Sequence, residues 1–191
     1  GSSGTLSFRS SFSPDVGKTI AALGHGVGGT SKTSIGRIRA LTIGPYTLHE
    51  PVVELSHAQT GTEAGCTVAA SIGERVLSRF TLYLDYAHER LILEPNAHLN
   101  DPFEYDMSGL DLAAAGSRLQ ELKIVAVRDA SAAAQAGLQS GDEIVAAGGK
   151  RISGRDVSRL RERLRRESDI RLTIERAGKT LHVVLHLRRE V

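Results

Sequence analysis

The chain has 191 residues, of which 40% are hydrophobic and 24% are charged, and its formal net charge is +2. These proportions are ordinary for a globular protein, and so small a net charge creates no overall field that attracts nucleic acid or an anionic membrane. No apolar run approaches the roughly 20 residues that span a bilayer, and a single cysteine excludes an internal disulfide. We therefore expect an aliphatic core and no membrane span, metal, other cofactor or nucleic-acid partner.

The first half of the chain is rich in short strand patterns separated by glycine turns. Apolar side chains alternate over residues 35–43, Gly44-Pro45 marks a turn, and residues 46–55 predict a returning strand. The pattern over residues 65–72 is apolar. This region therefore predicts an all-β fold.

A short helix and a hairpin are predicted next. Residues 74–79 fit a helix whose buried side carries Val76, Leu77 and Phe80. Residues 80–86 and 90–94 alternate as two strands around a turn at residues 87–89.

A domain boundary is predicted in the segment 94–102, where two prolines and two asparagines interrupt any regular element. We therefore assign residues 1–97 to one domain and residues 98–191 to a second.

The second half mixes helices with strands. Residues 109–112 open one strand, and residues 122–127 and 143–147 predict two more. Between them, Ser131 is placed to cap a short helix that Gly137 ends, because a left-handed C-cap strains any residue with a Cβ.

A longer helix and a closing hairpin complete the chain. Residues 155–166 predict a helix with Val157, Leu160 and Leu164 on one face, and residues 170–187 predict the hairpin. The helix carries many arginines, but interleaved Asp156, Glu162 and Glu167 favour a solvated face over a nucleic-acid contact.

One segment carries a family resemblance. Ser131-Ala-Ala-Ala-Gln-Ala-Gly-Leu138-Gln-Ser-Gly141-Asp142-Glu-Ile144 resembles the S-x-A-x-x-A-G-L-x-x-G-D-x-I signature of bacterial PDZ domains. The resemblance implies an α+β domain that binds extended peptides or protein termini between a strand and the long helix. The implied peptide-binding residues are Gly109, Leu110, Asp111, Leu112, Val157, Leu160 and Leu164.

Two alternatives stay open for that groove. Asp111 replaces the second glycine of the family's G-L-G-F loop, and its negative charge speaks against a bound terminal carboxylate but not against strand addition. A groove that is self-occupied, or that packs on the first domain, is the other reading.

The first half resembles retropepsin-like aspartic proteases. Ile72-Gly73 matches the hydrophobic-Gly segment that crosses behind the catalytic loop of that family, and Gly26-Val27-Gly28-Gly29 resembles a glycine-rich flap. The combination with a PDZ domain is similar to a family of bacterial exported proteins, which implies a periplasmic or other exported location. It also implies a homodimer, because each half carries one catalytic loop.

In that family the catalytic aspartate lies in a hydrophobic-Asp-[Thr/Ser]-Gly motif. This sequence contains no such motif. Gly1-Ser2-Ser3 is either the tail of such a loop or a remnant unrelated to it, and Asp15 is the remaining weak candidate. A proton-sharing pair of carboxylates cannot form without this loop, so the chain as given is expected to lack peptidase activity. The leading hypothesis is an aspartic-peptidase-like protein whose PDZ domain binds or presents peptides. The alternative is a non-catalytic peptide-binding or scaffolding protein.

Overall fold

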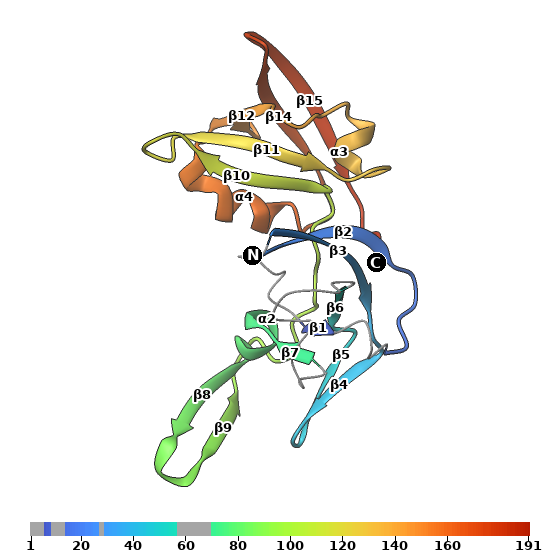
Figure 1. The fold of residues 1–191 in the computed structure, drawn as a ribbon, viewed down its shortest axis with the longest axis vertical. Helices are drawn as coiled ribbons and strands as arrows, with labels where there is room; N and C mark the ends of the chain where they lie inside the picture. The colour runs from blue at the N-terminus through green and yellow to red at the C-terminus, as the bar shows by residue number, and fades with distance from the viewer. Residues whose placement is uncertain (1–5, 9–13, 27–28, 57–69) are drawn as a thin grey trace. The chain divides into compact units, whose positions relative to one another are not determined.

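The protein divides into two compact units (Figure 1). The computed structural model describes residues 6–8, 14–26, 29–56 and 70–191. The first unit comprises residues 1–103 with Val191, and the second comprises residues 104–190. The division thus follows Phe103, somewhat downstream of the predicted position after Ala97.

Packing around Arg79 explains why the segment before Phe103 stays with the first unit. The Arg79 guanidinium lies 3.6 Å from the centroid of the buried Phe103 ring. Its Nη1 also donates hydrogen bonds to the carbonyls of His98, at 3.0 Å, and Leu99, at 2.9 Å. The prolines of this segment do break regular structure, but the contacts of the buried Arg79 side chain keep the segment packed against the first unit.

The first unit is built on a five-stranded sheet with the order β2-β3-β6-β1-β7. Its strands are β1 Leu6–Phe8, β2 Ile20–Gly26, β3 Gly29–Arg37, β6 Val52–Ser56 and β7 Ala70–Ile72. Strand β1 is parallel to β6, while the other pairs are antiparallel. Ile35, Val52 and Val53 are almost fully buried in its core.

The two long strands expected over residues 35–55 are interrupted, so that prediction was wrong in detail. Residues 40–43 and 46–49 form a separate hairpin, β4 Ala40–Ile43 and β5 Tyr46–His49. The break before β6 lies at Glu50, whose φ is 50°, and at Pro51, which has no N–H for a ladder. The alternation of apolar and polar residues in the sequence continues past Glu50 and Pro51, so it gave no sign of the break between β5 and β6.

The predicted helix and hairpin are present. Helix α2, Glu74–Leu77, buries Val76, and β8 Phe80–Asp85 pairs with β9 Arg90–Pro95 around the 3-10 turn η1 Tyr86–His88. The Asp85 carboxylate accepts a hydrogen bond from the His88 backbone N–H at 3.2 Å and stabilises that turn.

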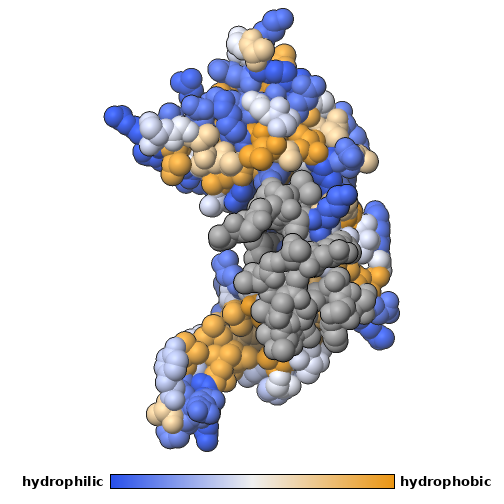
Figure 2. Space-filling view, in the orientation of Figure 1, coloured by the Kyte–Doolittle hydropathy of each residue, from blue (hydrophilic) through white to orange (hydrophobic). Residues whose placement is uncertain are grey.

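One face of the β8–β9 hairpin is apolar and exposed. Cross-strand partners share a face, and the register pairs Leu82 with Leu93 and Leu84 with Leu91. Leu84 is 63% exposed and Leu91 is 54% exposed. Figure 2 shows hydrophobic surface over this hairpin.

The second unit contains a sheet with the order β10-β11-β12-β14-β15, with β13 beside β12. Its strands are β10 Leu110–Ala115, β11 Glu121–Val127, β12 Glu143–Ala147, β13 Lys150–Arg151, β14 Ser168–Arg176 and β15 Lys179–Leu187. Its helical elements are α3 Ala132–Gln135, the 3-10 turn η2 Gly154–Asp156 and α4 Val157–Arg163. The core is aliphatic, as the composition predicts.

The long helix expected at residues 155–166 is shorter than predicted. Ser153 and Asp156 form a capping box around η2, so the regular helix α4 begins only at Val157. After Arg163 the backbone tightens, because the N–H groups of Arg165 and Arg166 donate to carbonyls three residues earlier. Within the described ranges, each helix is too short to traverse a bilayer.

Candidate functional site

Strand β10 has one open edge. It pairs with β11 on one side and ends the strand order of its sheet, so no described strand pairs with its other side. Helix α4 lies against β10 in the same unit (Figure 1). A strand edge beside a helix is the geometry that accepts an added peptide strand.

The outward backbone groups of β10 follow from its ladder. The Arg128 N–H donates to the Gly109 carbonyl at 2.9 Å, so Gly109 faces β11. Backbone groups alternate along a strand, which directs those of Leu110 and Leu112 to the open edge. One acceptor on the open edge already has a partner, because Arg161 on α4 donates from Nη2 to the Leu112 carbonyl at 2.6 Å.

The predicted peptide contacts divide into two groups. Leu112, Leu160 and Leu164 are at most 3% exposed and belong to the core. Leu110 and Val157 are only partly buried and pack against that core. We therefore assign the first three to folding, because a seven-residue helix must bury its apolar face to stay in place. Leu110 and Val157 stay as candidate contacts.

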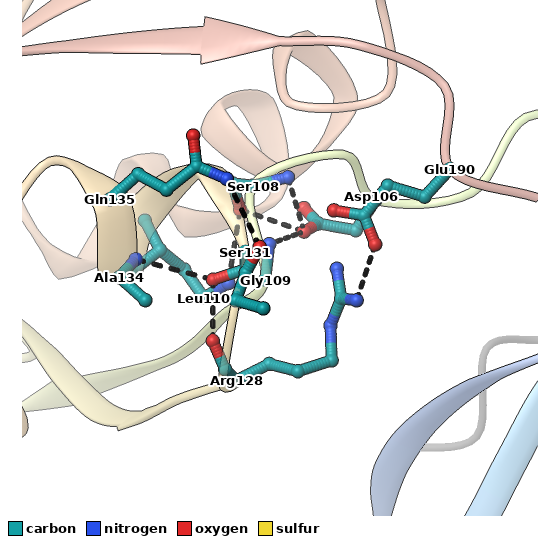
Figure 3. A network of polar contacts seen from close by, with 10 residues as sticks. Asp106, Ser108, Gly109, Leu110, Arg128, Ser131, Ala134, Gln135 and Glu190 are labelled. Atoms are coloured by element: carbon teal, nitrogen blue, oxygen red, sulfur yellow. Dashed lines mark hydrogen bonds and ion pairs between the residues drawn. The ribbon is translucent and has the colours of Figure 1, made fainter.

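A polar network organises the loop before β10 (Figure 3). Asp106 Oδ1 accepts hydrogen bonds from the Ser108 N–H at 2.9 Å, the Ser108 hydroxyl at 2.7 Å and the Gly109 N–H at 2.8 Å. The Ser108 Oγ in turn accepts from the Leu110 N–H at 3.1 Å. Burial raises the pKa of Asp106, and the hydrogen bonds from Ser108 and Gly109 oppose that shift.

The same loop is anchored to helix α3. The Ser108 carbonyl accepts from the Ala133 N–H at 2.9 Å, and the Ser131 hydroxyl donates to the Arg128 carbonyl at 2.6 Å. Ser131 also caps α3, as predicted, by accepting from the Ala134 N–H at 3.3 Å. Gly109 has a φ of 72°, and a Cβ at this position would lie 2.2 Å from the Ser131 Cβ. Glycine is therefore required where Gly109 passes Ser131.

The acidic residue of the Gly141-Asp142 turn supports the fold. Asp142 is 1% exposed and accepts from Arg176 Nε at 2.6 Å and Nη2 at 2.7 Å, and from the Gln139 N–H at 2.9 Å. The hydrogen bond from Arg176 is the main reason why the pKa of Asp142 lies below its ordinary value. This part of the signature joins β14 to the turn before β12.

The predicted residues of the first unit are only partly described. Gly26 and Gly29 pair at the ends of β2 and β3, as expected for a hairpin, whereas Val27, Gly28 and Gly1-Ser2-Ser3 lie outside the described residues. Ile72 ends β7, where it pairs with Leu6, and Gly73 is the N-cap of α2.

The structure describes Asp15, the catalytic candidate of the sequence, and many of the side chains that could bind a metal. Asp15 is an exposed residue in the segment before β2, unlike the sheltered carboxylates of acid–base sites. The described residues contain no group of three His, Cys, Asp or Glu side chains arranged for a metal. The role of Asp15 stays a prediction.

Sequence reasoning missed three residues of this site, namely Arg161, Asp106 and Ser108. Arg161 was one of several arginines on a helix, and no sequence pattern distinguishes it from the solvated ones. Asp106-Met-Ser108-Gly109 did carry a signal, because Asp and Ser before Gly commonly bond to backbone groups two or three residues onward.

The family comparison matches part of the second unit. Residues 123–176 match the family model of the PDZ domain. No curated protein sequence matches the chain. The retropepsin-like assignment of residues 1–97 gains no support from the family match, which lies entirely in the second unit. It stays a prediction.

Solved structures give distant overlaps. The HtrA3 PDZ domain bound to a phage-derived ligand (FGRWV) is 23% identical, with a TM-score of 0.39 over 42% of this chain and 83% of that one. The HtrA-type protease AlgW with decapeptide is 17% identical, with a TM-score of 0.45 over 96% of this chain and 64% of that one. The serine endoprotease from Yersinia pestis is 15% identical, with a TM-score of 0.42 over 92% and 63%. The chain thus spans less than two thirds of either protease.

The family match runs from within β11 to the end of β14, and the segment Ser131 to Ile144 inside it carries the predicted signature. The second unit of this protein therefore contains a PDZ domain.

Proposed function

We propose that the second unit binds extended peptide segments by strand addition to the open edge of β10. The observation that carries the proposal is that edge itself, which has no strand partner among the described residues and lies beside α4. Main-chain hydrogen bonds along an edge supply affinity, and side-chain contacts beside it supply selectivity.

The available contacts define the ligand. The outward carbonyl of Leu110 and the outward N–H and carbonyl of Leu112 face an antiparallel or parallel peptide backbone, whereas the Leu110 N–H already donates to Ser108 Oγ. Leu110 and Val157, both partly buried, offer apolar surface to every second peptide side chain. We therefore expect a ligand with at least one apolar side chain directed into the space between β10 and α4.

Binding requires Arg161 to leave the Leu112 carbonyl. The peptide N–H that pairs with this carbonyl replaces the Arg161 guanidinium, which is otherwise an exposed side chain. An exposed guanidinium regains water hydrogen bonds when it is displaced, so the exchange costs less than about 1 kcal/mol, which lowers the affinity severalfold at most. Arg161 then stands free to contact the ligand or solvent.

A second candidate function includes the first unit. The β2–β3 hairpin closes at Gly26 and Gly29, which is compatible with a flap over bound peptide, as the retropepsin resemblance implies. In that reading the PDZ domain presents peptides to an aspartic-peptidase-like unit. Since this sequence lacks the hydrophobic-Asp-[Thr/Ser]-Gly triplet, we propose that this chain binds peptides without cleaving them.

Amide hydrogen exchange on the full chain tests strand addition. A peptide selected by display should protect the outward N–H of Leu112, while N–H groups in the β10–β11 ladder are protected with or without peptide. Val157→Glu should weaken binding at least tenfold, because it places a charge against an apolar ligand side chain. Ser158→Glu adds the same charge at an exposed neighbouring position of α4 and should bind normally. Protection confined to another edge, or equal binding by both variants, would refute the proposal.

A further inference from the structure

The loop before β10 has its backbone donors occupied by the protein itself. Four successive N–H groups, from Met107 to Leu110, each donate within the second unit. Met107 donates to the Leu164 carbonyl at 2.9 Å, Ser108 and Gly109 donate to Asp106 Oδ1, and Leu110 donates to Ser108 Oγ.

This occupancy determines which ligands the loop accepts. A terminal carboxylate is held by a concave run of free backbone N–H groups. Here Asp106 Oδ1 already accepts the Ser108 and Gly109 N–H groups of that run (Figure 3). A ligand carboxylate would have to displace Asp106 from three hydrogen bonds.

The charged side chains around the loop do not make it more attractive to a ligand carboxylate. Asp111, at the start of β10, adds another acidic side chain beside the same loop. Arg128, whose charge acts on Asp106, is paired through Nη1 with Glu190 at 2.5 Å. The four backbone N–H groups of the loop are therefore occupied, and the donor that stays unpartnered beside them, Arg128 Nη2, is a buried atom.

We infer that this groove binds internal extended segments of polypeptide and does not require, or favour, a free C-terminus. The inference rests on the proposed strand addition at β10 and specifies its ligand class. The backbone edge at Leu110 and Leu112 supplies the affinity, and the loop at residues 106–109 only shapes the end of the groove.

Peptide libraries displayed in two formats supply the probes. In one format the random segment ends in a free carboxylate, and in the other the same segments are flanked on both sides by folded carriers. We expect the full chain to enrich binders from the flanked format. Synthetic free-acid and C-terminally amidated forms of each binder should then bind within about threefold of one another, since no contact to the carboxylate exists.

The outcomes separate this inference from the proposed function. A free acid that binds about tenfold or more tightly than its amide would overturn the inference but leave strand addition intact. In that case Arg128 Nη2, a buried atom with no hydrogen-bond partner among the described residues, would be the candidate donor to the ligand carboxylate. If neither form protects the Leu112 amide, strand addition itself fails, and the inference fails with it.

A variant pair tests the role assigned to Asp106. Asp106→Ala removes the internal acceptor and frees the Ser108 and Gly109 N–H groups, so preference for the free acid over the amide should rise about tenfold. Asp106→Asn retains an oxygen acceptor and should show a much smaller rise. Thermal unfolding and the near-ultraviolet spectrum are measured in parallel. If Asp106→Ala does not fold, the comparison of peptide forms on the unmodified chain decides alone.

Discussion

Arg161 and Leu112 are joined across the candidate groove, since the guanidinium Nη2 donates to the Leu112 carbonyl at 2.6 Å. The contact links α4 to the open edge of β10, and it occupies an acceptor that an added peptide strand needs. The second unit thus carries an internal competitor for its own ligand.

Replacement of Arg161 by Met should tighten peptide binding severalfold, because the competing donor is lost while most of the aliphatic stem remains. Stability should change by less than about 1 kcal/mol, since an exposed arginine contributes little. Arg159→Met, on the solvent side of the same helix, is the control. Titration calorimetry measures both, and weaker binding by Arg161→Met would show that Arg161 contacts the ligand instead.

The ion pair between Asp142 and Arg176 makes stability depend on pH. Because the pKa of Asp142 is lowered by folding, its contribution is present above the ordinary aspartate pKa of about 3.9 and is lost as pH falls further. Asp142→Asn should lower the free energy of unfolding by on the order of 2 kcal/mol at neutral pH. It should also flatten the acid limb of a stability–pH profile measured by denaturant. An unchanged acid limb would contradict this assignment.

Gly109→Ala should destabilise the second unit by more than about 2 kcal/mol, because a positive φ and a clash with Ser131 act together. Gly149→Ala is a matched control. Gly149 has a φ of 76°, but nothing lies within 4 Å of a Cβ placed there. It should therefore show only the conformational cost, about 1 kcal/mol. Equal losses in chemical denaturation would mean that the loop yields around the new methyl group.

The leucine face of the β8–β9 hairpin tests the expected homodimer. A two-stranded hairpin with one apolar face gains stability by burying that face, and a second copy offers an identical one. Leu84→Glu should lower the dimer fraction in sedimentation velocity. Thr81→Glu, on the opposite face of the hairpin, should leave it unchanged. A monomeric parent chain, or equal behaviour of the variants, would rule this interface out.

Peptide cleavage should be absent at acidic and neutral pH, because two facing carboxylates are needed and this chain lacks the motif that supplies them. Incubation with a mixed peptide library, followed by mass spectrometry, checks this expectation. Cleavage that pepstatin blocks and that Asp15→Asn abolishes would contradict it and establish Asp15 as a catalytic residue.

The sequence alone determined the elements whose geometry is local. Ser131 and Gly137 bound helix α3 as predicted, and the turn at Ala177-Gly178 has φ values of 49° and 75°, which match the β14–β15 hairpin. Such signals are readable because the residues that satisfy each backbone group lie within a few positions of it. The PDZ signature belongs to this class, and the family match covers it.

Only the tertiary structure decided which residues of a helix face belong to the core and which stay available to a ligand. Periodicity placed Val157, Leu160 and Leu164 on one helix face, but burial alone shows that the last two belong to the core. Likewise, no local pattern links Arg161 to Leu112, which lies 49 residues earlier in the chain. The physical reason is that the chemistry of a side chain determines the kind of environment it favours, apolar or polar. Which distant residue provides that environment depends on how the whole chain packs.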